Sequence, residues 1–350
     1  MRQILLDDDL QDRFIEAGFV QVPTLSAEEI AFIRSELATL RPDDNFAPTG
    51  RNGFKYSYHC SFLDTSIPYK RAAFDLITSV FAPHIKHYLN DYDVVTCSFY
   101  LKPPGTGAFQ IHQNWPMISN LNETTVTLWT PLGDVTALNG ALHFVKGSHK
   151  ILPHIESPTS PAYFNNFRKE LIQRHLTPLD MKAGESVIFD DSLIHWSPNN
   201  NSDTARIAIQ IALAPIDAHK VFFFFDRQHP ERFELVEADH EFYLASDVVD
   251  LTRRQPNWKH VGFVENQNRL IDEEEFVKLL KQGPERRKEV YASTDSTPKR
   301  IAADTAESQR IPGTVNAEAG QLCEESSNLS GELLSTQSKP SLFSRLMGRS

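Results

Sequence analysis

Two histidines, an asparagine and an arginine have the spacing of a metal site beside an anion-binding group. His112 and Asn114 lie two residues apart in Phe109–Trp115, so an extended segment would point both side chains the same way. His195 follows near the end of a second apolar run. Two imidazoles and one carboxylate on one face of Fe(II), with the opposite face open to an oxo-acid and O₂, form a non-haem oxygenase site.

Arg206 lies 11 residues after His195, at the start of the apolar stretch Arg206–Leu213. An unpaired guanidinium inside such a stretch would be costly, so it needs an anionic partner. That partner could be a structural carboxylate in the chain. We favour the far carboxylate of 2-oxoglutarate, which a guanidinium can bind through two parallel hydrogen bonds.

Asn114 departs from this pattern, because the chemistry favours Asp or Glu as the third ligand. An amide oxygen can bind a metal, but it is neutral and a weaker donor than a carboxylate. Three alternatives follow: the amide ligates and the site turns over, the site binds without turnover, or chloride takes the third position as in halogenating enzymes. Glu123, Asp190 and Asp191 are conceivable substitute carboxylates, although their spacing does not indicate it.

Several motifs make the chain resemble the phytanoyl-CoA dioxygenase family of Fe(II)/2-oxoglutarate-dependent oxygenases, from about Leu10 to Pro215. The spacing of His195 and Arg206 belongs to this resemblance. The matching segments are His112–Trp115, Leu128–Leu132, Asn139–Leu142, Lys146–Lys150, Phe14–Val20 and Pro23–Glu29.

The resemblance implies a mainly β fold, the double-stranded β-helix or cupin-like jelly roll, with N-terminal flanking helices. It also implies Fe(II) and 2-oxoglutarate as cofactors, O₂ and a small molecule as substrates, and hydroxylation of an unactivated C–H bond. The residues it assigns are His112, Asn114 and His195 to the metal, Arg206 and Ser197 to 2-oxoglutarate, and Trp129 and Phe189 to the pocket around it.

Other residues near these motifs have less specific assignments. Gln110, Gln113 and Trp115 flank the metal segment and are candidates for contact with the substrate. His143 and His149 fall in runs that favour a scaffold role, in packing or in capping a strand.

The elements that must position these residues are short strands with a few helices. Apolar periodicity and capping signals predict helices over 8–17, 26–40, 69–89 and 272–281. Alternation and β-branched or aromatic runs predict strands over 19–23, 94–101, 124–130, 141–145, 186–189 and 206–214.

Composition and charge exclude several classes of protein. The net charge of −11 argues against a nucleic-acid-binding face, and no apolar run approaches the ~20 residues of a membrane helix. Cys60, Cys97 and Cys323 are isolated, which favours reduced thiols and a cytoplasmic location.

Residues 1–282 are expected to form the oxygenase-like domain. Residues 283–350 are expected to be a disordered tail, because they contain two aromatic residues and many Ser and Thr.

Overall fold

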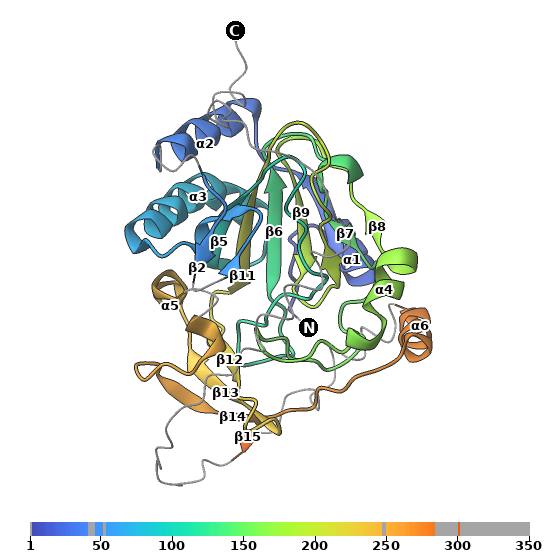
Figure 1. Cartoon of the computed structure of the whole chain (residues 1–350). Helices are drawn as coiled ribbons and strands as arrows, with labels where there is room; N and C mark the ends of the chain where they lie inside the picture. The colour runs from blue at the N-terminus through green and yellow to red at the C-terminus, as the bar shows by residue number, and fades with distance from the viewer. Residues whose placement is uncertain (1, 41–45, 52–53, 247–249, 284–299, 302–350) are drawn as a thin grey trace.

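The computed structural model describes residues 2–40, 46–51, 54–246, 250–283 and 300–301 (Figure 1). The α-helices are α1 Asp8–Ala17, α2 Ala27–Leu40, α3 Ile67–Tyr88, α4 Arg168–Glu170, α5 His240–Ala245 and α6 Glu273–Lys281. The strands are β1 Phe19–Pro23, β2 Gly50–Arg51, β3 Phe54–Lys55, β4 His59–Cys60, β5 Tyr92–Lys102, β6 Val126–Pro131, β7 His143–Phe144, β8 Thr177–Pro178, β9 Glu185–Asp190, β10 His195–Trp196, β11 Arg206–Pro215, β12 Val221–Phe225, β13 Arg232–Glu237, β14 His260–Glu265 and β15 Arg300–Ile301.

Two antiparallel sheets form the barrel. The larger has the order β1-β9-β6-β11-β5-β4 and the smaller β10-β7-β8. An isolated bridge between His112 and His195 adds the segment around His112 to the smaller sheet. Trp129, Phe189 and Ala208 of the larger sheet pack with Phe144 of the smaller one in a shared apolar core. This arrangement is a double-stranded β-helix, as the sequence predicts.

The side chains of the larger sheet alternate between its two faces, and both faces are apolar. Helices therefore cover its outer face. Figure 1 shows α2 and α3 side by side against this sheet. The buried positions of α3 recur every three or four residues, as in Ala73, Ile77 and Phe81, and pack against Ile207 and Ile209 of β11. Since Ile207 and Ile209 point outward, Arg206 and Ala208 point into the barrel.

Local capping explains where the first helices begin and end. Ser26 and Glu29 form the predicted capping box, in which the Ser26 amide donates to Glu29 Oε2 at 2.8 Å and the Glu29 amide donates to Ser26 Oγ at 3.2 Å. Gly18 ends α1 with φ of 87°, a conformation that favours glycine. His149 packs against Gly18, and its Nε2 lies 3.0 Å from the Ile15 carbonyl, in keeping with a scaffold role.

A further antiparallel sheet, β12-β13-β14-β15, lies beyond the barrel at its lower end in Figure 1. The sequence did not predict this sheet, because all five residues of β12 are buried and show no alternation. The predicted strand over 141–145 is also shorter in the structure, where β7 contains only two residues.

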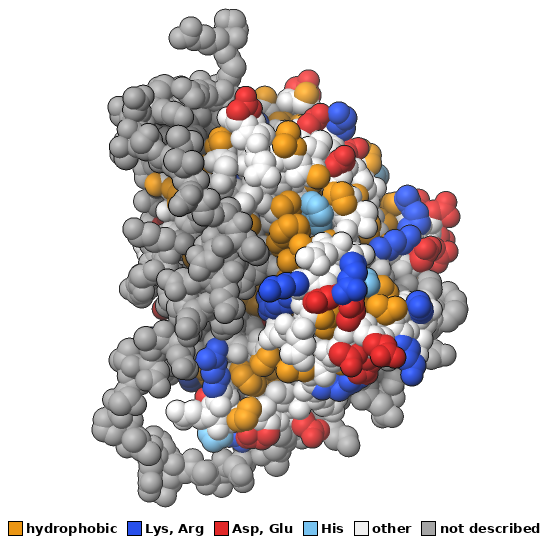
Figure 2. Space-filling view, turned by 45° about the vertical axis from the view of Figure 1, so that its right-hand side comes forward, with side chains coloured by type: hydrophobic (Ala, Val, Ile, Leu, Met, Phe, Trp, Pro, Cys, Tyr) orange, Lys and Arg blue, Asp and Glu red, His pale blue; other side chains and the backbone are white. Residues whose placement is uncertain are grey.

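The expected tail, residues 283–350, lies outside the described residues except for Gly283 and β15. Figure 2 shows one face of the molecule, on which acidic and basic side chains are interspersed with apolar ones. No helix within the described ranges is both long and apolar enough to cross a membrane.

Candidate active site

His112 and His195 lie side by side across the smaller sheet. Each backbone amide donates to the other residue's carbonyl at 3.0 Å, and the two ring centroids are 4.2 Å apart. The Nδ1 of His112 is 2.7 Å from the Gln110 carbonyl, and the Nδ1 of His195 is 2.9 Å from the Leu193 carbonyl. A carbonyl only accepts, so both Nδ1 atoms carry the proton and both Nε2 atoms are left with a lone pair for a metal.

Both imidazoles are held in their neutral form. Burial lowers the pKa of His195 well below its ordinary value, and the neighbouring His112 lowers it further. Burial also lowers the pKa of His112. Since metal ions bind the neutral imidazole, neither ring has to lose a proton at pH 7 before it can ligate.

Asn114 is held by a closed set of hydrogen bonds. Its Nδ2 donates to Thr127 Oγ1 at 2.8 Å and to Asp191 Oδ1 at 3.1 Å, and the Thr127 hydroxyl donates to the same Asp191 oxygen at 2.7 Å. Both amide hydrogens are therefore used. Within the described part of the chain, the amide oxygen of Asn114 accepts no hydrogen bond, so it is available as a donor to a metal.

The substitute carboxylates considered from the sequence do not complete a conventional triad. Among the described residues, no three His, Cys, Asp or Glu side chains are grouped to hold a metal. Glu123 lies 3.7 Å from Arg2, and Asp190 Oδ1 accepts from the backbone amide of Ser192 at 2.7 Å. Asp191 contacts Asn114 instead, and burial raises its pKa to about 6 against hydrogen bonds from Thr125, Thr127 and Asn114.

Arg206 is a buried cation with free donors. Its Nε and Nη1 are buried and have no hydrogen-bond partner among the described residues. Its guanidinium carbon lies 5.3 Å from the centre of the Trp129 ring. Burial lowers its pKa to about 10, so it stays protonated at neutral pH. An unpaired buried guanidinium indicates that an anionic ligand belongs beside it.

A second buried cation, Lys102, was missed from the sequence. It lies directly opposite Arg206 in the β5–β11 pair, so both side chains are on the inner face. Its Nζ donates to Ser197 Oγ and to the Pro198 carbonyl, both at 2.7 Å. Burial and Arg206 lower its pKa well below the ordinary value. None of the ion pairs within the described residues involves either side chain, so both lack a carboxylate partner there.

Ser197, Trp129 and Phe189 lie around the imidazoles and the two buried cations. The Ser197 hydroxyl accepts from Lys102 and donates to the Gly140 carbonyl at 2.7 Å. Phe189 packs edge-on against the His195 ring at 5.0 Å. Trp129 and Phe189 thus form one apolar wall that joins the pair of imidazoles to the pair of buried cations.

A cavity of about 70 Å³ adjoins Asn114, and one of the three candidate substrate residues lines it. Gln113 lines the cavity, and its amide donates to the Ser192 carbonyl. Trp115 instead packs 6.1 Å from Phe222, and the Gln110 carbonyl faces the Nδ1 of His112.

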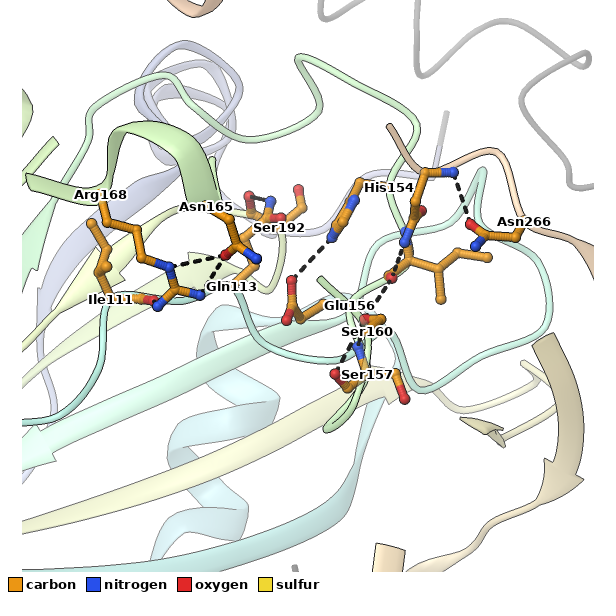
Figure 3. Close-up of polar contacts among 12 residues, drawn as sticks. Ile111, Gln113, His154, Glu156, Ser157, Ser160, Asn165, Arg168, Ser192 and Asn266 are labelled. Carbon is orange, nitrogen blue, oxygen red and sulfur yellow. Dashed lines mark hydrogen bonds and ion pairs between the residues drawn. The ribbon is translucent and has the colours of Figure 1, made fainter. Parts of the chain in front are cut away.

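Glu156 and His154, which the sequence analysis did not single out, also line this cavity. Figure 3 shows Glu156 between His154 and Arg168; the Glu156 carboxylate lies 3.0 Å from His154 Nε2. The charge of Glu156 raises the pKa of His112 and that of Arg168 lowers it, so both groups are near the imidazole pair.

Comparison with known proteins places these motifs in a family. The family model described as phytanoyl-CoA dioxygenase (PhyH) matches residues 14–208. Phytanoyl-CoA dioxygenase 1 of Oryza sativa subsp. japonica is 28% identical over 170 residues, which cover 45% of this chain and 50% of the relative. The peroxisomal phytanoyl-CoA dioxygenase of Homo sapiens is 27% identical over 164 residues, covering 43% and 47%. The chain spans about half the length of these curated relatives.

Solved structures with a similar arrangement are more distant in sequence. The non-haem α-ketoglutarate-dependent carbocyclase SnoK from nogalamycin biosynthesis is 18% identical, with a TM-score of 0.48 over 61% of this chain and 86% of that one. HygX from Streptomyces hygroscopicus, with nickel and 2-oxoglutarate bound, is 15% identical, with a TM-score of 0.43 over 61% and 88%.

Proposed function

Because the chain belongs to the phytanoyl-CoA dioxygenase family, we propose that it binds Fe(II) and 2-oxoglutarate and hydroxylates a C–H bond of a small metabolite. One observation carries this proposal. A buried guanidinium with two unpaired nitrogens shares one apolar wall with two neutral imidazoles that have free lone pairs. In the overall reaction, 2-oxoglutarate, O₂ and R–H give succinate, CO₂ and R–OH.

The metal would be held by His112, His195 and the amide oxygen of Asn114. Their donor set fits Fe(II), since imidazole and oxygen ligands suit this ion. Bound Fe(II) supplies the one-electron chemistry that activates O₂, which no side chain can supply. The chain's own part is to fix both imidazoles through their Nδ1 hydrogen bonds and to hold them neutral.

The far carboxylate of 2-oxoglutarate would lie against Arg206 and Lys102. The unpaired Nε and Nη1 of Arg206 would donate to it, and Lys102 would add a second positive charge. Trp129 and Phe189 would line the same pocket and exclude water. The substrate would enter the adjoining cavity, where Gln113 and Glu156 offer hydrogen-bonding groups.

A second candidate function is binding without turnover on the same barrel. Asn114 favours it, because a neutral ligand leaves Fe(II) with two imidazoles, one amide and no protein anion in direct contact. In that case the chain binds metal and 2-oxoglutarate but forms no succinate.

Replacing Asn114 with alanine tests whether the amide is a ligand. We expect Asn114→Ala to bind Fe(II) at least ~10-fold more weakly under anaerobic calorimetry, since losing even an outer hydrogen-bond partner of a metal site costs about 10–100-fold. Any Fe(II)-dependent formation of succinate should be slower in Asn114→Ala than in the wild type. A matched control is Asn90→Ala, which removes a distant, partly exposed amide that donates to the Gln3 carbonyl. If Asn114→Ala matches the wild type in affinity and turnover, the third position belongs to another group.

A further inference from the structure

The buried carboxylate of Asp191 lies directly behind Asn114. Asp191 is 3% exposed and follows β9, while Thr127, fully buried, belongs to the neighbouring strand β6. No ion pair within the described residues involves Asp191, and its Oδ2 is buried without a hydrogen-bond partner. A charge placed this way is costly to folding, so stability alone does not explain it.

The contact between Asp191 and Asn114 determines which way the amide faces. An ionised carboxylate only accepts hydrogen bonds, so the amide must turn its NH₂ group toward Asp191. The Thr127 hydroxyl hydrogen already points to Asp191, which leaves the Thr127 oxygen to accept the other amide hydrogen. A flipped amide would bring its oxygen against two acceptors and would present its NH₂ group to a metal cation.

We propose that Asp191 is a positioning residue that fixes the Asn114 amide with its oxygen toward the metal site and supplies, one hydrogen bond away, the negative charge that the ligand lacks. This inference rests on the proposed function. The hydrogen bonds polarise the amide, because a donor bound to an anion gains electron density at its carbonyl oxygen. Asn114 and Asp191 together would then replace the usual carboxylate ligand. The negative charge would lie on Asp191, which contacts the ligand, and not on the ligand itself.

Exchanging the two side chains gives the sharpest test. In Asn114→Asp alone, the new carboxylate would face Asp191 across the present 3.1 Å contact, and like charges at that distance repel. In Asn114→Asp/Asp191→Asn, the carboxylate occupies the ligand position and the amide supports it. The replacement Asp191→Asn should therefore weaken metal binding when residue 114 is the native Asn114. The same replacement should strengthen metal binding in the Asn114→Asp variant.

The measurement is calorimetric titration of the purified full chain with Co(II) alone, with the Co(II) absorption spectrum as a second readout of the ligand set. We expect Asp191→Asn to bind Co(II) about 10–100-fold more weakly than the wild type. The exchanged pair should bind at least as tightly as the wild type. Glu123→Gln is the matched control: it removes a charge from the same cavity without contacting Asn114, and its affinity should stay within about twofold.

Thermal melting of the metal-free variants separates a positioning role from a structural one. Asp191→Asn should melt no lower than the wild type, because it removes a buried charge that has no cation. Should Asp191→Asn fail to fold, comparing Asn114→Asp with the exchanged pair still tests the sign reversal.

Three outcomes would contradict parts of this account. Equal Co(II) affinity of Asp191→Asn and wild type would overturn this inference but not the proposed function. The inference would also be overturned if Asp191→Asn changed the Co(II) affinity in the same direction in the native chain and in the Asn114→Asp variant. No Co(II) binding by the wild type, with or without 2-oxoglutarate, would overturn the proposed function and the inference with it.

Discussion

Arg206→Ala is expected to abolish detectable 2-oxoglutarate binding. The guanidinium is buried, two of its nitrogens have no partner within the described chain, and Lys102 lies opposite it. Removing one member of a buried, hydrogen-bonded charge pair costs about 2–5 kcal/mol, or roughly 30-fold to a few thousand-fold in affinity. Calorimetric titration with 2-oxoglutarate in the presence of Mn(II) measures the loss.

Two companion variants show whether the guanidinium or only its charge is needed. Arg206→Lys keeps the charge but loses the paired donors, so most of the affinity should still disappear. Lys102→Met should weaken binding less, because Lys102 already donates to Ser197 and Pro198. The metal-free melting temperature of Arg206→Ala should not fall, since the guanidinium is unpaired. Unchanged 2-oxoglutarate affinity in Arg206→Ala would remove Arg206 from the site.

His195→Ala is expected to eliminate specific metal binding. It removes one of two adjacent imidazoles and leaves one imidazole and one amide, too few donors to hold a divalent ion. The loss should exceed the ~10–100-fold of an outer-partner substitution. Because burial lowers the pKa of both imidazoles, wild-type affinity should change little between pH 7 and pH 8, when no histidine proton has to leave.

His143→Gln is the matched control for this loss. His143 lies on β7, beside β10, and its Nδ1 is 3.1 Å from the Ala141 carbonyl. It therefore belongs to the same small sheet without belonging to the imidazole pair. Calorimetry should show wild-type metal affinity for His143→Gln. Retained affinity in His195→Ala, or an equal loss in both variants, would contradict the assignment.

Local patterns made much of the fold and the site predictable. The Ser26–Glu29 capping box and the helical spacing of α3 specify elements through nearby residues. The grouping of His112 with Asn114, and of His195 with Arg206, came from short spacings in the chain. Such signals survive in one sequence because the strand period fixes side-chain direction.

Features that depend on strand register could not be predicted from the sequence. Lys102 is a lone cation at the end of β5, and only its position opposite Arg206 shows that it faces inward. Asp191 reaches Asn114 through a contact 77 residues apart in the chain. The sheet around β12 was missed because a strand buried on both faces has no alternation to read.

Succinate formation from 2-oxoglutarate under air, with and without added Fe(II), tests the central claim most directly. Because no R–H is supplied, the assay contains ascorbate as the two-electron reductant, so that 2-oxoglutarate, O₂ and ascorbate give succinate, CO₂, water and dehydroascorbate. We predict Fe(II)-dependent succinate above background in the wild type, absent in His195→Ala and in Arg206→Ala. Wild-type protein that binds both metal and 2-oxoglutarate yet forms no succinate at any Fe(II) concentration would contradict the enzyme assignment and leave a binding protein.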